Sequence, residues 1–112
     1  MKSIVAFIQP SKEEAVREAL HSLSGLSGAT FMHVRGFGRG RGTPDASSEE
    51  AIVGTLRKVR VDIMADDHIV DQAVTAIARA AHTGRRGDGK VYVLPIESAL
   101  RISTGETGAI AV

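Results

Sequence analysis

The sequence predicts an α+β domain in which two helices cover one face of a four-stranded antiparallel sheet. A chain of 112 residues has room for one hydrophobic core, so residues 1–112 are expected to form a single domain. Four strand-like stretches and two helical stripes follow one another in the order strand–helix–strand–strand–helix–strand. A long Gly-rich loop separates the second strand from the third. This is the ferredoxin-like βαββαβ pattern.

The chain opens with a strand and a helix. Residues 4–8 are continuously apolar, as in a buried strand, and Pro10 ends the run. Ser11 followed by Glu14 has the spacing of a capping box, which predicts a helix start at Ser11. The apolar stripe of this helix consists of Val16, Ala19, Leu20 and Leu23.

The second and third predicted strands lie on either side of the Gly-rich loop. Gly25 and Gly28 are expected to end the first helix. Residues 30–35 contain enough apolar side chains for a strand, and residues 59–63 alternate between apolar and charged ones. The alternation predicts a strand that is buried on one face only.

A second helix and a last strand complete the pattern. Asp66 and Asp67 stand at the start of the helix, where its dipole favours acidic groups. Gly84 is expected to stop the helix, and residues 91–96 to form a strand with Pro95 at its end or on a sheet edge. The helix-free face of the sheet also needs a cover. Another copy is the simplest one, so we expect a homo-oligomer.

Composition and charge argue against several classes of protein. The chain has no Cys, which rules out disulfides and thiolate chemistry. Its net charge of +1 and the absence of an RNP-like aromatic run argue against nucleic-acid binding. No apolar stretch reaches the length of a membrane span, and residues 4–8 are too short for a signal peptide. The expected location is therefore cytoplasmic, with no direct membrane insertion.

The most specific local motif lies in residues 83–90. From Gly84 to Lys90 the chain has the spacing G-x-x-x-x-G-K, in which backbone N–H groups and a Lys bind phosphate. Val91 stands where an NTPase has its Mg-binding hydroxyl, and the segment runs from a helix into a strand, the reverse of the usual order. These features favour a phosphate cradle without hydrolysis. A plain Gly-rich connector and a slow ATPase that uses Lys90 remain open.

Two further sets of residues could carry chemistry. The run from Gly36 to Gly42, with Arg39 and Arg41, suits either a second anion-binding nest or a flexible hinge. The histidines show no metal-ligand spacing that is repeated, and no nucleophile is paired with a base. We therefore predict no metal site, no catalytic residue and no enzymatic activity.

Several motifs resemble the PII signalling proteins, and the similarity runs over most of the chain. The most specific of them are Thr83-Gly84-x-x-Gly87-Asp88-Gly89-Lys90 and Arg101-Ile102-x-Thr104-Gly105-Glu106. The others are residues 1–10, 16–20, 36–39 and 69–71. The resemblance implies a compact homotrimer that binds ATP, ADP or AMP in the clefts between subunits. It also implies control of a transporter, an enzyme or a regulator through a mobile T-loop, here about residues 39–56.

The resemblance also assigns roles to individual positions. Thr83, Gly87, Asp88, Gly89 and Lys90 would surround the phosphates, and Arg101 would add positive charge to the same cleft. Gly36, Gly38 and Arg39 would contact the nucleotide at the base of the T-loop. Thr30 and Met64 would line the adenine pocket. Lys58 matches a residue linked to 2-oxoglutarate.

Departures from the family pattern make this chain a divergent, PII-like member. Gly40 replaces a Gln whose side chain helps hold Mg and 2-oxoglutarate, and Ser103 replaces a second Arg in the nucleotide cleft. The loop has no Tyr for uridylylation. We therefore expect weaker triphosphate binding and an effector such as bicarbonate near Lys58, Arg39 and Gly40. A standard nitrogen regulator that binds ATP and 2-oxoglutarate, with Mg, is the alternative.

Overall fold

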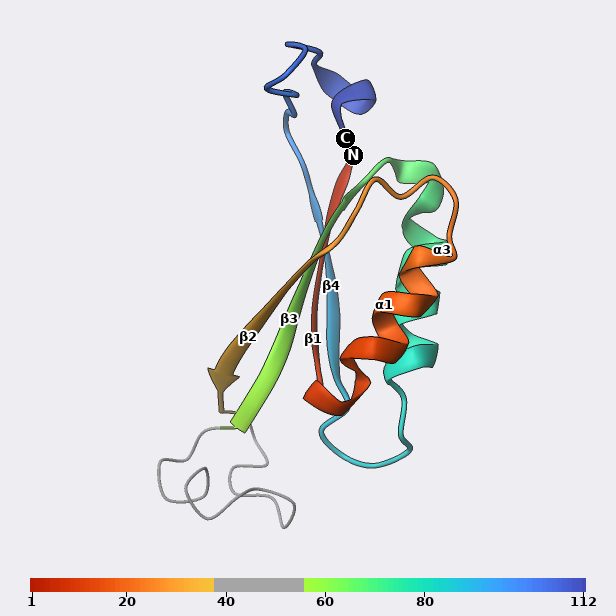
Figure 1. The fold of residues 1–112 in the computed structure, drawn as a ribbon, viewed down its shortest axis with the longest axis vertical. Coiled ribbons are helices and arrows are strands. Elements are labelled where there is room, and N and C mark those ends of the chain that lie inside the picture. The colour runs from red at the N-terminus through yellow and green to blue at the C-terminus, as the bar shows by residue number, and fades with distance from the viewer. Residues whose placement is uncertain (38–55) are drawn as a thin grey trace.

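The computed structural model describes residues 1–37 and 56–112 and confirms the ferredoxin-like α+β fold (Figure 1). The elements are β1 (Lys2–Ile8), the 3-10 turn η1 (Pro10–Lys12), α1 (Glu13–His21), β2 (Thr30–Gly36), β3 (Leu56–Ala65), α3 (Asp67–Ala81), β4 (Gly89–Pro95) and the 3-10 turn η2 (Gly108–Ala111). The four strands form one antiparallel sheet in the order β2-β3-β1-β4. Both helices lie on the same side of it (Figure 1).

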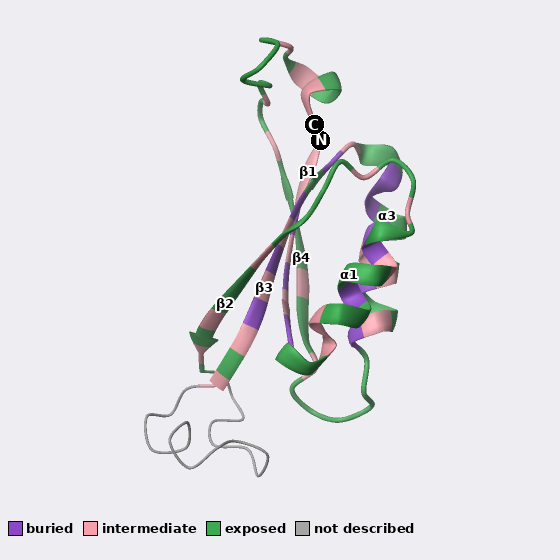
Figure 2. Ribbon diagram, viewed as in Figure 1, coloured by how far each residue is buried: buried purple, intermediate pink, exposed green. Residues whose placement is uncertain are grey.

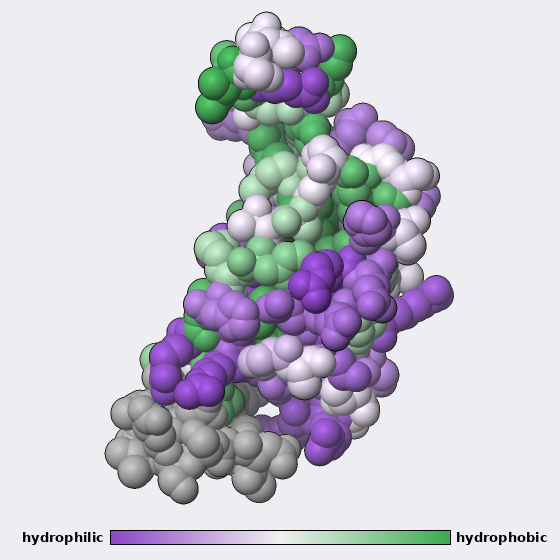
Figure 3. Space-filling view, in the orientation of Figure 1, coloured by the Kyte–Doolittle hydropathy of each residue, from purple (hydrophilic) through white to green (hydrophobic). Residues whose placement is uncertain are grey.

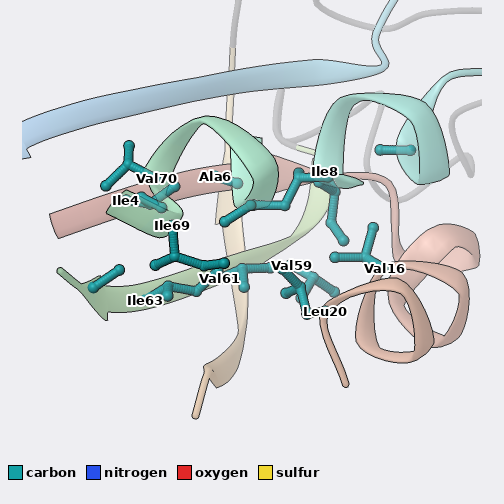
Figure 4. Packing of buried hydrophobic residues seen from close by; sticks show 14 residues of the cluster. Ile4, Ala6, Ile8, Val16, Leu20, Val59, Val61, Ile63, Ile69 and Val70 are labelled. Atoms are coloured by element: carbon teal, nitrogen blue, oxygen red, sulfur yellow. The ribbon is translucent and has the colours of Figure 1, made fainter. Parts of the chain in front are cut away.

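The hydrophobic core lies between the sheet and the two helices (Figures 2 and 4). Every second residue of β1 and β3 points into it, and Ile4 pairs with Ile63 across the two strands. Ile77 of α3 is completely buried against this layer. Burial of one such side chain contributes about 1.5–3 kcal/mol. β1 and β3, the two central strands, therefore fix the positions of the loops at their ends.

The first helix begins and ends differently from the sequence prediction. Ser11 lies inside η1, and the residue before α1 is Lys12, which makes no side-chain cap. The predicted capping box is thus wrong, because Pro10 starts a tighter turn that takes Ser11 away from the capping position. The helix ends at His21, where the Ser22 hydroxyl donates to the carbonyl oxygen of Ala19. Gly25, with φ +96°, follows in the connection to β2.

The remaining elements agree with prediction but are longer. Asp66 caps α3, because its Oδ1 accepts a hydrogen bond from the backbone N–H of Asp67. β3 extends to both sides of the predicted segment because it pairs with two neighbours, and β4 begins at Gly89 rather than Val91. Pro95 ends β4, which is an edge strand as predicted. None of the described helices is long and apolar enough to cross a membrane.

The sheet face opposite the helices carries a mixture of apolar and charged side chains. Arg60 forms two hydrogen bonds to Asp62, and its guanidinium lies 5.8 Å from the centre of the Phe7 ring. Phe7 in turn contacts Tyr92 edge to face. The large apolar residues exposed on this face and in the C-terminal segment, residues 97–112, are Met32, Met64, Tyr92, Leu94, Leu100, Ile102 and Ile110. Figure 3 shows hydrophobic side chains gathered on the C-terminal segment and the neighbouring part of the sheet.

Candidate functional site

The predicted phosphate loop connects α3 to β4 at one end of the sheet. At this end β1 stops at Ile8, β3 begins at Leu56, and β4 begins at Gly89 (Figure 1). Gly84 and Gly87 have φ of +84° and +88°, in the left-handed region that favours glycine. The segment therefore turns sharply twice between the helix and the strand, and its residues 82–87 are exposed.

Asp88 closes this loop on itself. Its carboxylate accepts hydrogen bonds from the hydroxyl and the backbone N–H of Thr83, the latter at 2.8 Å, and His82 Nδ1 lies 3.5 Å away. The Thr83 oxygen also accepts from the backbone N–H of Arg85 at 3.1 Å. Hydrogen bonds from the Thr83 hydroxyl and backbone N–H, in that order, lower the pKa of Asp88. The Asp88 carboxylate therefore forms its hydrogen bonds within the loop.

The hydrogen bonds between the Asp88 carboxylate and Thr83 are expected to depend on pH. Because the pKa of Asp88 is lowered in the folded protein, its contribution to stability is present above the unfolded pKa and is lost as pH falls through the folded value. The chemical shift of the Thr83 amide, followed by NMR during acid titration, should change with a midpoint below 3.8, the ordinary value for this carboxyl. In Asp88→Asn this transition should be absent. A midpoint at or above 3.8 in the wild-type protein would contradict the assigned hydrogen bonds.

The loop is also fixed to the end of β1. A Cβ atom on Gly89, whose φ is +110°, would overlap the carbonyl oxygen of Phe7. The carbonyl oxygen of Gly87 accepts hydrogen bonds from Gln9 Nε2 at 2.6 Å and from Lys58 Nζ at 3.0 Å. Backbone contact on one side and two side-chain donors on the other therefore hold residues 87–89 in place.

Two lysines stand beside the loop on the helix-free face of the sheet. Lys90 is paired with Phe7 across β1 and β4, and Lys58 alternates with the buried residues of β3. Lys90 is exposed, whereas Lys58 is partly buried and its pKa is lowered by that burial, with Asp88 acting in the opposite direction. Backbone N–H groups, positive-φ glycines and two ammonium groups suit an anion such as a phosphate chain.

The other residues predicted at the base of the T-loop fall into two groups. Gly36 is the last residue of β2 and lies at the same end of the sheet as the phosphate loop. Gly38, Arg39 and Gly40 lie outside the described residues, as does the predicted T-loop apart from its last residue, Leu56.

The residues predicted to line the adenine pocket lie at the opposite end of the sheet. Met64 lies six positions after Lys58 along β3, which corresponds to about 20 Å at the rise of a strand. Thr30 pairs with Asp62 near that far end. Arg101 and Ser103 follow β4 beyond the same end. One chain therefore does not bring its two groups of predicted ligand residues together.

Arg101 is already engaged within its own chain. Its guanidinium donates to Glu106 Oε1 at 3.1 Å and to the carbonyl oxygen of Ile110 at 3.0 Å. Thr104 donates to the same Glu106 oxygen at 2.7 Å. These bonds fold the C-terminal segment into a compact turn and leave the cation of Arg101 partly neutralised.

Comparison with known proteins assigns the family. The family model described as "Nitrogen regulatory protein P-II" matches residues 1–106. The chain belongs to the PII family. Relatives called nitrogen regulatory protein P-II in Azospirillum brasilense, Rhodospirillum rubrum and Bradyrhizobium diazoefficiens are 44%, 45% and 47% identical to it. Each alignment spans 113 positions and covers the whole of both chains.

Membership of the PII family confirms the resemblance found in the sequence. Proteins of this family are signalling regulators rather than typical enzymes, and the names of the relatives point to nitrogen regulation. The contact that sequence reasoning missed is that of Gln9 with Gly87. The sequence carries a signal for it, since Gln9 is the one polar residue between the apolar run and Pro10.

Proposed function

We propose that this chain is a PII-type regulator that binds ATP, ADP or AMP and acts on a protein target through residues 39–56. The observation that carries the proposal is the anchored loop of residues 83–90. Its glycines Gly84, Gly87 and Gly89 have positive φ, its one carboxylate is bonded to Thr83, and Lys90 stands exposed at its end. Glycine turns of this kind next to an exposed ammonium group suit the binding of an anion.

The predicted ligand residues lie at opposite ends of the sheet within one chain, and this separation supports a nucleotide cleft between subunits. In a homotrimer the loop of one copy would meet Thr30, Met64, Arg101 or Ser103 of a neighbour, and residues that lie at opposite ends of one sheet would then serve one nucleotide. The exposed apolar side chains support such contacts. Tyr92 is 49% exposed and Ile102 is 94% exposed in a single chain. Covering them with other copies would be favourable.

The second effector proposed is a small oxyanion such as bicarbonate. Lys58 supplies a partly buried ammonium group beside the loop, and Gly40 has no side chain with which to hold Mg and 2-oxoglutarate. Nitrogen regulation with ATP and 2-oxoglutarate is the second candidate, favoured by the names of the relatives. The target, whether a transporter, an enzyme or a regulator, would be recognised by protein contact, with no role for nucleic acid.

Calorimetric titration of the purified protein tests these proposals. ATP, ADP and AMP are titrated singly, and bicarbonate and 2-oxoglutarate are then titrated in the presence of each nucleotide, with and without Mg. We expect adenine nucleotide binding in every case, with ADP or AMP at least as tight as ATP. Absence of any nucleotide binding would overturn the proposed function. Tight, Mg-dependent 2-oxoglutarate binding would instead favour the standard regulator, and turnover of ATP that is lost in Lys90→Ala would favour a slow ATPase.

A further inference from the structure

The carbonyl oxygen of Gly87 receives two donors from two different strands. Gln9 Nε2 approaches it to 2.6 Å and Lys58 Nζ to 3.0 Å. The strand register explains this meeting. The last printed pair of β1 and β3 is Ile8 with Val59, so the next step of the ladder places Gln9 beside Lys58. Both side chains therefore leave the sheet at the point where the loop passes over it.

The two donors differ in how much they gain from this carbonyl. A neutral amide and a carbonyl form an ordinary hydrogen bond, which satisfies one of the two N–H groups of Gln9. The ammonium of Lys58 is partly removed from water, and burial lowers its pKa. A neutral carbonyl compensates for that desolvation less well than an anion does. An incoming anion would therefore be a better partner for the Lys58 ammonium than the Gly87 carbonyl is. The neutral amide of Gln9 has no such reason to leave the carbonyl.

The orientation of the Gly87 carbonyl matters for the loop as a whole. A carbonyl and the following N–H belong to one rigid peptide plane, so fixing the oxygen of Gly87 also fixes the direction of the Asp88 N–H. On its other side the loop is held by the contact of Gly89 with the backbone of Phe7. If the carbonyl of Gly87 lost both donors, residues 84–88 would be tied down by the bonds between Thr83 and Asp88 and by Gly89 alone.

We propose that Gln9 is a positioning residue that holds the Gly87 carbonyl permanently, so that Lys58 can move from this carbonyl to a bound oxyanion without releasing the phosphate loop. Gln9 is the constant anchor and Lys58 the exchangeable one. The inference rests on the proposed nucleotide role of residues 83–90. It explains how a second ligand at Lys58 and a nucleotide at the loop can be bound at the same time.

A double-mutant cycle in the full chain tests the inference. Gln9→Met keeps the length of the side chain and removes the donor, Gln9→Lys restores a donor, and Lys58→Met removes the other anchor. The first measurement is amide hydrogen exchange of residues 84–90 without any ligand, and the second is ADP affinity. Thermal melting of each variant shows that it is folded.

Loss of an average hydrogen bond corresponds to about a fivefold change in an opening equilibrium. We expect Gln9→Met to speed exchange in the loop and weaken ADP binding by about that factor, and Gln9→Lys to return both to nearly wild-type values. Lys58→Met should speed exchange in the loop less than Gln9→Met does, because a neutral carbonyl compensates poorly for the partial burial of the ammonium and its bond to Lys58 is therefore the weaker of the two. The double variant should lose more than the sum of the two single changes, because the carbonyl is then without either donor.

Three results would overturn the inference: wild-type exchange and affinity in Gln9→Met, equal loosening by Lys58→Met and Gln9→Met, or failure of Gln9→Lys to rescue. The last would mean that bulk rather than a donor matters at residue 9. The proposed function fails separately, if the wild-type protein binds no ADP. The exchange measurements then still decide whether Gln9 holds the loop.

Discussion

Gly89→Ala is expected to unfold the junction between the phosphate loop and the sheet, and to destabilise the protein by about 2–4 kcal/mol. The new Cβ would overlap the carbonyl oxygen of Phe7, which is backbone in the central strand β1 and has no alternative position. The φ of +110° adds strain for any residue with a side chain. Relief requires β4 to separate from β1 at this end. Chemical denaturation measures the loss of stability, and calorimetry should find ADP binding abolished.

Gly28→Ala is the matched control for this prediction. A Cβ on Gly28 meets no atom within 4 Å, and the residue does not have a positive φ. The control should therefore change stability by no more than about 0.5 kcal/mol and leave ADP affinity unaltered. A Gly89→Ala protein with wild-type stability and affinity would show that the loop does not depend on this close approach.

Lys90→Ala is expected to weaken adenine nucleotide binding by about 1.5–3 kcal/mol, which corresponds to about 10- to 150-fold in the dissociation constant. The reason is the loss of a charged donor next to the turn at residues 84–89. Lys90 follows Gly89 in β4 and is exposed on the helix-free face, so its removal should not disturb the core. Calorimetric titration with ADP and ATP measures the effect, and the melting temperature should stay close to that of the wild type.

Arg79→Ala removes the same formal charge from the last turn of α3 and serves as the control. It should leave the affinity within about twofold, since a surface charge outside the loop is screened by salt. Lys90→Arg should recover part of the affinity, because it restores the charge but not the shape of the donor. Equal affinities of wild type and Lys90→Ala would remove Lys90 from the proposed site.

Local patterns were sufficient to predict the elements of the fold. The continuous apolar run in β1, the alternation in β3 and the stripe in α3 each specify a face that must be buried, and burial on one side dictates the layer arrangement. The start of α1 was mispredicted because a capping box competes with the turn that Pro10 imposes, and the sequence pattern does not decide between them.

The ligand roles of the candidate site stay predictions, but the conformation of its loop could be predicted in part. The glycine spacing from Gly84 to Lys90 identified the loop, because residues that need positive φ are visible as glycines in the sequence. The partners that fix the loop were not identified. Gln9 and Lys58 are far from Gly87 along the chain, and they meet at its carbonyl only because β1 and β3 pair in one particular register.

The sequence by itself determined the class of fold, the family and the position of the glycine turns within residues 83–90, since apolar periodicity and glycine spacing are local properties. Only the tertiary structure decided how that loop is held and where the other predicted ligand residues lie. Strand order and register are consequences of packing between distant segments. They place Gln9, Lys58 and Gly89 at one end of the sheet and Thr30 and Met64 at the other. That separation is why a complete nucleotide site is proposed between copies of the chain rather than within one.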